Sequence, residues 1–566
     1  MDDSTNTVTG QRRGSSAIPS RRPSRRDSVP VPEDDDPDDD GGGDDGDDDG
    51  GNNADGNRRK TPRLTHAVYI AKLANNFNQY GELKAANADR LTLDDVVHSI
   101  MDLATAYSTA RRNAFMAAHE QMQQQRQPDT VDGVDPQQAR ATAETQRMIR
   151  RAIRKLNAND IRGAIAALSQ SPIVSLDSVE RIQELQRLYG AEPAPEPAQV
   201  VDNIRETQHV QDDDGDADDA DTYEPASATA CLLQGDAASD AAFHVDNSAM
   251  MATLESRKTG AGAGFSGLSY DAIKAAVKRD PQPVLTGLTA VINDVGSGRI
   301  VQDRLVKRLR TLRGIPLLKP NGGIRPIGIC EALLQLAGCA AWRAKKTAAA
   351  DVTGPTALGF GVKYGLEAAV FLVNGFLETN AGTVLISVDM RNAFNTLSRG
   401  AVFEGVGPIP ELHAYTTVRN SGISDIAYKD NTGKDQFISV TTGVIQGDSG
   451  GSGTFNLAFR HPVAAVNNYL RFHGGLMVSI HDDGSILGKP AHAFAALAML
   501  QREAAKIGLH VQPSKSAVYA PSGVTDHIRT LAAEAGIPIV DGLCIAGAPI
   551  GTDEYVSSNL LSIVDE

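Results

Sequence analysis

The stretch that decides the fold runs from Leu476 to Leu487 and reads Leu-Met-Val-Ser-Ile-His-Asp-Asp-Gly-Ser-Ile-Leu. Two apolar runs flank a polar centre that ends in Asp-Gly, which is typical of a β-hairpin. This turn would lift Asp482 and Asp483 to the tip of the hairpin. Because adjacent carboxylates repel each other, the arrangement is costly unless a cation lies beside it. If the hairpin stood alone, a solvated turn would be an equally good interpretation.

A second carboxylate follows a second apolar run. The segment from Thr383 reads Thr-Val-Leu-Ile-Ser-Val-Asp and predicts a buried strand that ends at Asp389, with Phe394 five residues later. If this strand lies beside the hairpin, three carboxylates offer hard oxygen ligands to two divalent cations. Nucleotidyl transfer needs such a donor set, because one ion activates a primer hydroxyl and both stabilise the in-line transition state.

Cationic residues gather upstream of these carboxylates. The stretch 299–346 holds 11 Lys and Arg residues against 2 acidic ones, a balance that suits phosphate contacts. Within it, Asn-Gly-Gly at 321–323 predicts a hairpin tip, with Lys319 and Arg325 on the two arms. Both side chains could reach one triphosphate, Arg325 as a bidentate donor and Lys319 as a point charge. The alternative is a solvated helix face.

Two further segments complete the candidate site. Lys515 lies in Pro-Ser-Lys-Ser, after a helix-like run at 491–507, where it could donate a proton to a leaving pyrophosphate. An exposed turn lysine is the alternative. The loop Gly-Val-Ile-Gln-Gly-Asp-Ser-Gly-Gly begins at Gly443 and precedes a helix expected from about 452 to 471. Its glycines would allow a template base or a nucleotide to approach the backbone closely.

The formal net charge of -16 does not exclude a nucleic-acid partner, because it is unevenly distributed. Residues 33–49 hold 12 acidic side chains and 202–224 hold 10, and such blocks stay disordered. From 251 to the end, 29 basic residues face 26 acidic ones. The four cysteines form no close pair, so neither a metal motif nor a disulfide framework is indicated.

Composition and periodicity divide the chain into six parts. We expect a disordered Arg/Ser then Asp/Gly-rich tail, a helical accessory region, a polar linker, a helical lead-in, a mostly disordered acidic linker and a catalytic portion. Their bounds are 1–61, 62–125, 126–144, 145–200, 201–260 and 261–566. No apolar run approaches about 18 residues and the start does not resemble a signal peptide, so we expect an intracellular protein without a membrane span.

Six motifs, in order, resemble those of reverse transcriptases, most closely the non-LTR retrotransposon type. Leu-x-Lys319-Pro-Asn-Gly-Gly-x-Arg325-Pro-Ile resembles the fingers motif. Val-Asp389-Met-Arg-Asn-Ala-Phe-Asn, Gly-Val-Ile-Gln446-Gly-Asp and Asp482-Asp-Gly resemble the first three palm motifs. Gly508-Leu-x-x-x-Pro-Ser-Lys resembles the fourth, and 543–551 resembles the primer-grip region. The segment Gly264-Phe-Ser-Gly-Leu-Ser-Tyr also resembles the one that precedes the fingers. The match covers roughly 260–555 well and 146–190 loosely.

The resemblance implies an α+β fold of right-hand fingers and palm, with an antiparallel sheet backed by helices and an N-terminal helical region. It implies an RNA-directed DNA polymerase that adds deoxynucleotides to a DNA or RNA primer on an RNA template. Two Mg²⁺ or Mn²⁺ ions would be its cofactors, and deoxynucleoside triphosphates its substrates. A nuclear location follows from the same resemblance and is weakly favoured by Arg58-Arg59-Lys60. The oligomeric state is not indicated.

The resemblance also assigns roles to single residues. The metal ligands would be Asp389, Asp482, Asp483 and the main-chain carbonyl of Met390. Nucleotide-binding residues would be Lys319, Arg325, Gln446, Gly447 and Phe394, the last as a bulky gate against a ribose 2′-hydroxyl. Lys515 would be the proton donor. Contacts with template and primer would come from Gly443, Asp448, Ile480 and His481.

Three departures from the family pattern leave alternatives open. Ile480 stands where a tyrosine is usual, and Ser449 stands where a proline is usual. The chain ends fifteen residues after Gly551, with almost no room for a thumb. One alternative is a catalytically inactive, truncated remnant that binds nucleic acid. Another is an RNA-dependent RNA polymerase, although those enzymes usually carry a second Asp where Phe394 lies.

Overall fold

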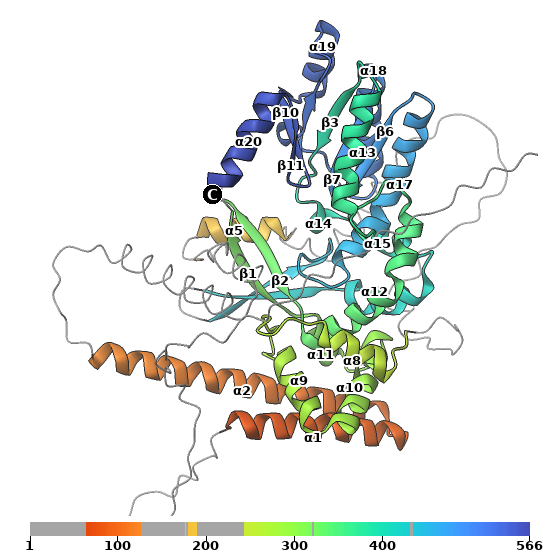
Figure 1. Ribbon diagram of the computed structural model, residues 1–566. Coiled ribbons are helices and arrows are strands. Elements are labelled where there is room, and N and C mark those ends of the chain that lie inside the picture. Colours follow the sequence, from red (N-terminus) through yellow and green to blue (C-terminus); the bar gives the residue numbers. More distant parts are fainter. Residues whose placement is uncertain are drawn as a thin grey trace, which may run out of the picture. The chain divides into compact units, whose positions relative to one another are not determined.

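The computed structural model describes residues 64–125, 176, 179–189, 243–319, 322–430 and 434–565. The expected tail at 1–61 with its basic Arg58–Lys60 string, the polar linker and most of the lead-in lie outside these ranges. All the elements below belong to one compact unit, Arg63–Glu566 (Figure 1). This unit is mixed α/β, and none of its described helices is long and apolar enough to cross a membrane.

Two long helices occupy the region whose periodicity predicts helices. They are α1 (His66–Ala85) and α2 (Arg90–Gln125), and the Thr65 hydroxyl caps the first turn of α1. Helix α1 packs on α10 (Pro281–Gly296) so closely that a Cβ on Gly287 would lie 1.8 Å from the carbonyl oxygen of Phe77. Only glycine at this position allows the contact between the two helices.

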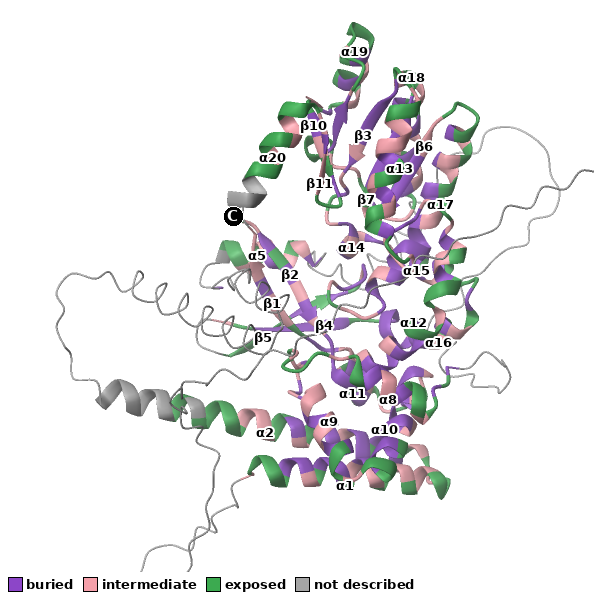
Figure 2. Ribbon diagram, in the orientation of Figure 1, coloured by how far each residue is buried: buried purple, intermediate pink, exposed green. Residues whose placement is uncertain are grey.

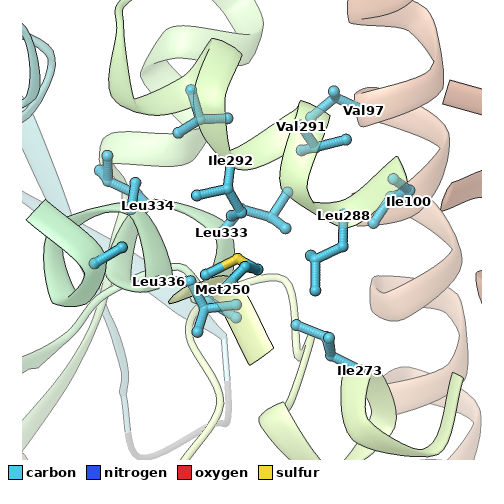
Figure 3. Close-up of a cluster of buried hydrophobic side chains, with 14 of the residues drawn as sticks. Val97, Ile100, Met250, Ile273, Leu288, Val291, Ile292, Leu333, Leu334 and Leu336 are labelled. Atoms are coloured by element: carbon cyan, nitrogen blue, oxygen red, sulfur yellow. The ribbon is translucent and has the colours of Figure 1, made fainter. Parts of the chain in front are cut away.

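A helical core joins these helices to the rest of the unit. It adds α8 (Asn247–Glu255), α9 (Tyr270–Arg279), α11 (Asp303–Arg310) and α12 (Ala332–Thr353). Figure 3 shows apolar side chains from five of these helices meeting there, namely Val97, Ile100, Met250, Ile273, Leu288, Val291, Ile292, Leu333, Leu334 and Leu336. After the acidic linker, the described chain resumes at Phe243, before the expected boundary at residue 261, and α8 supplies Met250 and Leu254 to this core.

A four-stranded sheet carries the predicted hairpin of the basic region. Its order is β2-β1-β4-β5, with β1 (Leu312–Leu318), β2 (Ile324–Ile329), β4 (Ser424–Lys429) and β5 (Asp435–Val440). Strands β1 and β2 are antiparallel, whereas β1 and β4 are parallel. Helix α5 (Val179–Leu188) contacts β2, and its Leu185 and the following Tyr189 are buried among the strand side chains.

A five-stranded sheet carries the three carboxylates. Its order is β6-β7-β3-β8-β9, with β6 (Leu476–Ile480), β7 (Asp483–Gly488), β3 (Val384–Val388), β8 (Ala517–Tyr519) and β9 (Ile539–Val540). The expected Asp-Gly hairpin is β6–β7. The sheet is mixed and not antiparallel throughout, because β9 runs parallel to β8. The expectation of an antiparallel sheet is therefore wrong for the edge strand β9, as it is for the β1–β4 pair.

Both faces of the five-stranded sheet are covered. Helices α17 (Gly451–Arg471) and α18 (Pro490–Ala505) bury Val384, Ile386 and Val388 on one face. Helix α13 (Gly365–Thr379) and the hairpin β10–β11 (Gly542–Ile545, Ala548–Gly551) bury Leu385 on the other. Figure 2 shows the resulting buried layer. Two-sided burial explains why β3 is an almost continuous apolar run and not an alternating one.

The remaining elements connect these layers. Listed in chain order they are α14 (Ala393–Thr396), α15 (Arg399–Val406), η1 (Pro410–Leu412), α16 (His413–Asn420), η2 (Pro513–Lys515), α19 (Asp526–Ala535) and α20 (Asp553–Asp565). Of these, α14 and η2 lie directly beside the carboxylate end of β3, as the next subsection describes.

Candidate active site

The strand pairing brings the predicted carboxylates together. Val388 of β3 pairs with Gly484 of β7, so the next residue along each strand places Asp389 across from Asp483. Ile480 pairs with Asp483 at the end of the β6–β7 hairpin, which leaves His481 and Asp482 as its two-residue turn. The three carboxylates therefore lie at one end of neighbouring strands, although more than 90 residues of sequence separate Asp389 from the other two.

The backbone at Asp389 is held by the segment that carries Lys515. The amide of Asp389 donates to the Ser516 hydroxyl at 3.1 Å, and its carbonyl accepts from the amide of Gln512 at 2.8 Å. Met390 forms an isolated antiparallel bridge with Val511. The hydrogen bonds of this bridge come from the residues that flank Met390, so they do not engage its carbonyl.

The tip of the hairpin is fixed by His481. This residue has a left-handed backbone with φ of 56°, which allows the tight turn. Its ring nitrogen Nδ1 lies 2.6 Å from the side-chain amide nitrogen of Asn456 on α17. Burial lowers the pKa of His481, so a neutral ring that accepts this hydrogen bond is favoured. The contact ties the turn that carries Asp482 to the helix beneath it.

Burial and neighbouring carboxylates raise the pKa values of Asp482 and Asp483. Burial, and then the charges of Asp483 and Asp389, raise the pKa of Asp482 to about 6. Asp483 is exposed, but the protein around its carboxyl and then the charge of Asp389 raise its pKa as well. These shifts mean that the fold concentrates negative charge here without neutralising it.

Two predicted cations act on the same cluster. Burial raises the pKa of Asp389, whereas the charges of Lys515 and Lys319 lower it. Lys515 is exposed on η2. Leu317 pairs with Arg325 across the β1–β2 hairpin, so Lys319, two residues after Leu317, shares a face with Arg325. Arg325 is exposed, and the two arms of this hairpin thus present both cations on one face.

Phe394 lies beside the hairpin tip. Its ring stacks on Phe455 of α17 at 4.8 Å and meets the ring of His481 edge-on at 6.2 Å. The side-chain amides of Asn392 and Asn395 both donate to the carbonyl of Leu188, at 2.7 and 2.8 Å. The turn that carries Phe394 is therefore held between α17 and the end of α5.

The glycine-rich loop packs against β2 and α14. The carbonyl of Gln446 accepts from the amide of Gly328 at 3.0 Å, and the carbonyl of Gly447 accepts from the Gln335 side chain at 3.2 Å. Gly443 has φ of 74°, and a Cβ there would lie 2.4 Å from the carbonyl oxygen of Asn395. Close packing inside the protein therefore requires glycine at position 443, whereas Gly447 is exposed.

Asp448 differs from the role that the sequence suggested. Its side chain is 6% exposed and forms an ion pair with the buried Arg419 at 3.5 Å. The hydroxyl of Tyr415 also donates to it, at 3.1 Å. These partners turn the carboxylate into the protein, so it supports the glycine-rich loop from behind and does not face a template or primer.

Several residues at this site escaped the sequence reasoning. Ser516 stands next to Lys515 and was not singled out, although Ser and Thr commonly hold a neighbouring backbone. Asn395 follows Asn392 by three residues, a spacing that places both amides on one side of α14. Nothing in the sequence identifies Leu188 as the partner of these two amides, or Asn456 as the partner of His481, because both partners come from distant segments.

The carboxylates at this site offer oxygen ligands, the type that hard divalent cations prefer. Within the described ranges, no group of three or more His, Cys, Asp or Glu side chains is gathered closely enough to enclose a metal ion by itself. Mg²⁺ is usually bound by one or two carboxylates together with substrate phosphates and water. At this site burial and neighbouring carboxylates raise the pKa values of Asp482 and Asp483, a shift that a bound cation would offset.

Comparison with known proteins gives distant structural similarity. No family model and no curated protein matches the sequence. A structure of apo telomerase from Candida tropicalis, truncated from the C-terminal domain, aligns with 50% of this chain and 70% of its own at 13% identity and a TM-score of 0.33. Apo telomerase from the same organism aligns with 45% of this chain and 51% of its own, at 12% identity and a TM-score of 0.31. Both TM-scores are low, so the function proposed below rests on the site itself.

Proposed function

We propose that this chain is an RNA-directed DNA polymerase of the reverse-transcriptase type, with fingers formed by the four-stranded sheet and a palm formed by the five-stranded sheet. The observation that carries the proposal is the placement of Asp389 across from Asp483, with Asp482 in the adjoining turn. The charges of Lys515 and Lys319 both lower the pKa of Asp389, so cationic and anionic groups lie close together, as transfer of a nucleotide requires.

The carboxylates would hold the metal ions. Two Mg²⁺ or Mn²⁺ ions would activate the primer hydroxyl and stabilise the in-line transition state when bound. Asp389, Asp482 and Asp483 would supply the charged oxygens. The carbonyl of Met390 would add a neutral oxygen ligand. It takes part in neither of the two hydrogen bonds of the bridge between Met390 and Val511.

The cations would bind the triphosphate of the incoming nucleotide. Lys319 and Arg325 share one face of the β1–β2 hairpin and would contact its phosphate oxygens. Lys515 would donate a proton to an oxygen of the leaving pyrophosphate. Lys515 lies between Gln512 and Ser516, which hydrogen-bond to the backbone of Asp389. The proton donor and the metal ligand would therefore keep a fixed position relative to each other.

The sugar and the template strand would meet the other predicted residues. Phe394, stacked on Phe455, would present a rigid ring where a ribose 2′-hydroxyl would have to lie. Gln446 and the exposed Gly447 would line the nucleotide and template, and Ile480 and His481 would face the primer end. An RNA template and a DNA or RNA primer are the proposed partners. Membership of a non-LTR retrotransposon and a nuclear site of action are proposed on the sequence resemblance alone.

Primer extension tests this function. Purified full-length protein should extend a primer on an RNA template with Mg²⁺ or Mn²⁺ and deoxynucleotides, and the Asp482→Ala/Asp483→Ala variant should not. Phe394→Ala should raise the incorporation of ribonucleotides relative to deoxynucleotides. Folded wild-type protein that binds RNA but extends no primer would instead indicate an inactive nucleic-acid-binding protein. A wild-type preference for ribonucleotides would indicate an RNA-dependent RNA polymerase.

A further inference from the structure

A large cavity lies away from the carboxylate cluster, at the outer edge of the four-stranded sheet. It has a volume of about 650 Å³ and is lined by α2, α11, β4, β5 and the segment at Phe265. Arg304, Lys307 and Arg308 of α11 supply cations, and Phe265 and Phe437 form an edge-on aromatic pair at 5.8 Å. Phe437 is 52% exposed, so its ring is available to a ligand.

A second cavity lies further along α2. It has a volume of about 530 Å³, and its lining includes His66 and the pair Arg111 and Arg112. Tyr69 and Tyr107 also line it and stack on each other at 4.1 Å with nearly parallel rings. Tyr69 is 1% exposed, and its hydroxyl has no hydrogen-bond partner among the described residues. A polar ligand beside Arg111 and Arg112 could supply a partner to this buried hydroxyl.

The two cavities follow one another along the same helix. Thr105 lines the first and Arg111 the second, a separation of about 9 Å along the axis of α2. Between the two cavities, the loop that contains Gly267 packs onto Ser108 of α2. Gly267 has φ of 84°, and a Cβ added to it would lie 2.6 Å from the Cβ of Ser108. The loop therefore divides one basic and aromatic track into two neighbouring sites.

The charges of the track favour an anionic ligand. Lys307 is paired with Asp425 at 3.2 Å, and Arg308 is paired with Asp102. Within the described part of the chain, Arg111, Arg112 and Arg304 have no carboxylate partner, and all three are exposed. Unpaired guanidinium groups are good ligands for phosphate oxygens.

We propose that this track binds single-stranded nucleic acid, with a base stacked on the exposed ring of Phe437 and phosphates on Arg111, Arg112 and Arg304. Cationic grooves with aromatic platforms bind single strands because every base has a π-face. A duplex keeps its bases inside and would gain nothing from the rings, and an acidic peptide would use only the arginines. The choice of ligand rests on the proposed polymerase function, in which a single-stranded stretch of template lies outside the catalytic cleft.

Binding of a labelled oligonucleotide tests the proposal separately from catalysis. Full-length protein carrying Asp482→Ala/Asp483→Ala would be titrated with a uridine 12-mer RNA, the matching DNA single strand and a DNA duplex, by fluorescence anisotropy. Phe437→Leu should weaken single-strand binding at least about fivefold, and Phe437→Tyr should restore it. Arg112→Gln with Arg304→Gln should reduce the dependence of log affinity on log salt by about 1.4, or about 0.7 for each lost phosphate contact.

Controls separate the track from general electrostatics. Arg502→Gln with Arg529→Gln removes two exposed arginines from α18 and α19 and should leave binding within about twofold of the parent. RNA and DNA single strands bound alike would indicate recognition of bases and phosphates alone, and a preference for RNA would indicate a template-specific track; both support the proposal. Unchanged affinity in the Phe437→Leu and arginine variants, equal binding of duplex, or full displacement by an Asp/Gly-rich peptide would overturn it. Wild-type protein that binds the single strands but extends no primer would count against the proposed function only.

Discussion

Two regions of the molecule hold carboxylates with shifted pKa values, and they differ in how the negative charge is compensated. In the helical core, Asp294 is fully buried and contacts Lys84 at 2.7 Å, Arg90 at 2.9 Å and the Tyr80 hydroxyl at 2.8 Å. Burial alone would raise its pKa, but the hydrogen bonds from these three residues outweigh burial and lower it. At the end of β3 and β7, burial and then the like charges of Asp483 and Asp389 instead raise the pKa of Asp482 to about 6.

The difference separates a structural charge from a functional one. Lys84 and Arg90 flank the turn between α1 and α2, so the Asp294 cluster ties both helices to α10. Nothing outside the chain is needed there. The carboxylates at 389, 482 and 483 remain only partly compensated, and a cation from solution would complete them. Perturbed carboxylates of this second kind are typical of active sites.

The largest expected effect is on catalysis by Asp389→Asn. The substitution removes a charged metal ligand but keeps the shape of the side chain, so primer extension should fall more than about 1000-fold. The melting temperature should stay the same or rise, because one like charge leaves the cluster. Single-turnover extension and a thermal melt measure the two effects. If Asp389→Asn kept a tenth of the wild-type extension rate, Asp389 would not be a functional charge of the kind that distinguishes this site from Asp294.

The second effect is on stability. Asp294→Asn leaves Lys84 and Arg90 without their counter-charge and should lower the free energy of unfolding by about 3 kcal/mol. The extension rate per folded molecule should not change. Denaturant titration measures the loss, and Glu534→Gln, which removes an exposed carboxylate from α19, should shift stability by less than about 0.5 kcal/mol. Equal losses in both variants would show that Asp294 is not a structural charge.

The pH dependence of stability should have opposite signs at the two sites. The folded pKa of Asp482 lies above its ordinary value, so its contribution is full at low pH and is lost as the pH rises through about 6. The pKa of Asp294 is lowered, so its contribution is present at neutral pH and is lost as the pH falls. Asp482→Asn should therefore stabilise the protein at pH 7 but not at pH 4. Asp294→Asn should be most destabilising at pH 7. Melting temperatures of both variants measured from pH 4 to pH 7 test this, and stability changes that vary with pH in the same direction in both variants would contradict the distinction.

The smallest effect should come from the support of the hairpin tip. Asn456→Ala removes the hydrogen bond to His481 and should cost about 1 kcal/mol of stability. Because the turn that carries Asp482 would lose one anchor, the extension rate should fall up to about tenfold. Rate and melting temperature measured on the same preparation test this. An unchanged rate would show that the β6–β7 pairing alone positions Asp482.

Local patterns were sufficient to predict the elements that carry the carboxylates. Apolar runs around Asp-Gly predict the β6–β7 hairpin, and the run before Asp389 predicts β3, because both signals lie within a few residues. The predicted helix at about 452–471 corresponds to α17 at Gly451–Arg471, and that at 491–507 to α18 at Pro490–Ala505. The adjacency of β3 and the β6–β7 hairpin in one sheet was implied by the family resemblance and not by the spacing of the residues.

What the sequence could not indicate depends on distant partners. Asp448 reads as an exposed loop residue, yet Arg419 and Tyr415, from another helix, turn it inward. The parallel pair β8–β9 escaped notice because β9 has only two residues. The contribution of α8 to the core was hidden by the acidic composition of the segment before it.

Nucleotide-dependent binding of Mn²⁺ tests the central claim most directly. The loss of the free-ion signal in electron paramagnetic resonance would be followed for wild-type protein, Asp294→Asn and Asp482→Asn/Asp483→Asn, with and without a deoxynucleoside triphosphate and a primed RNA template. The account predicts additional bound Mn²⁺ with the nucleotide in wild-type and Asp294→Asn protein, and none in the double variant beyond what free nucleotide binds. Equal binding by the double variant would contradict the assignment of these carboxylates as the metal site.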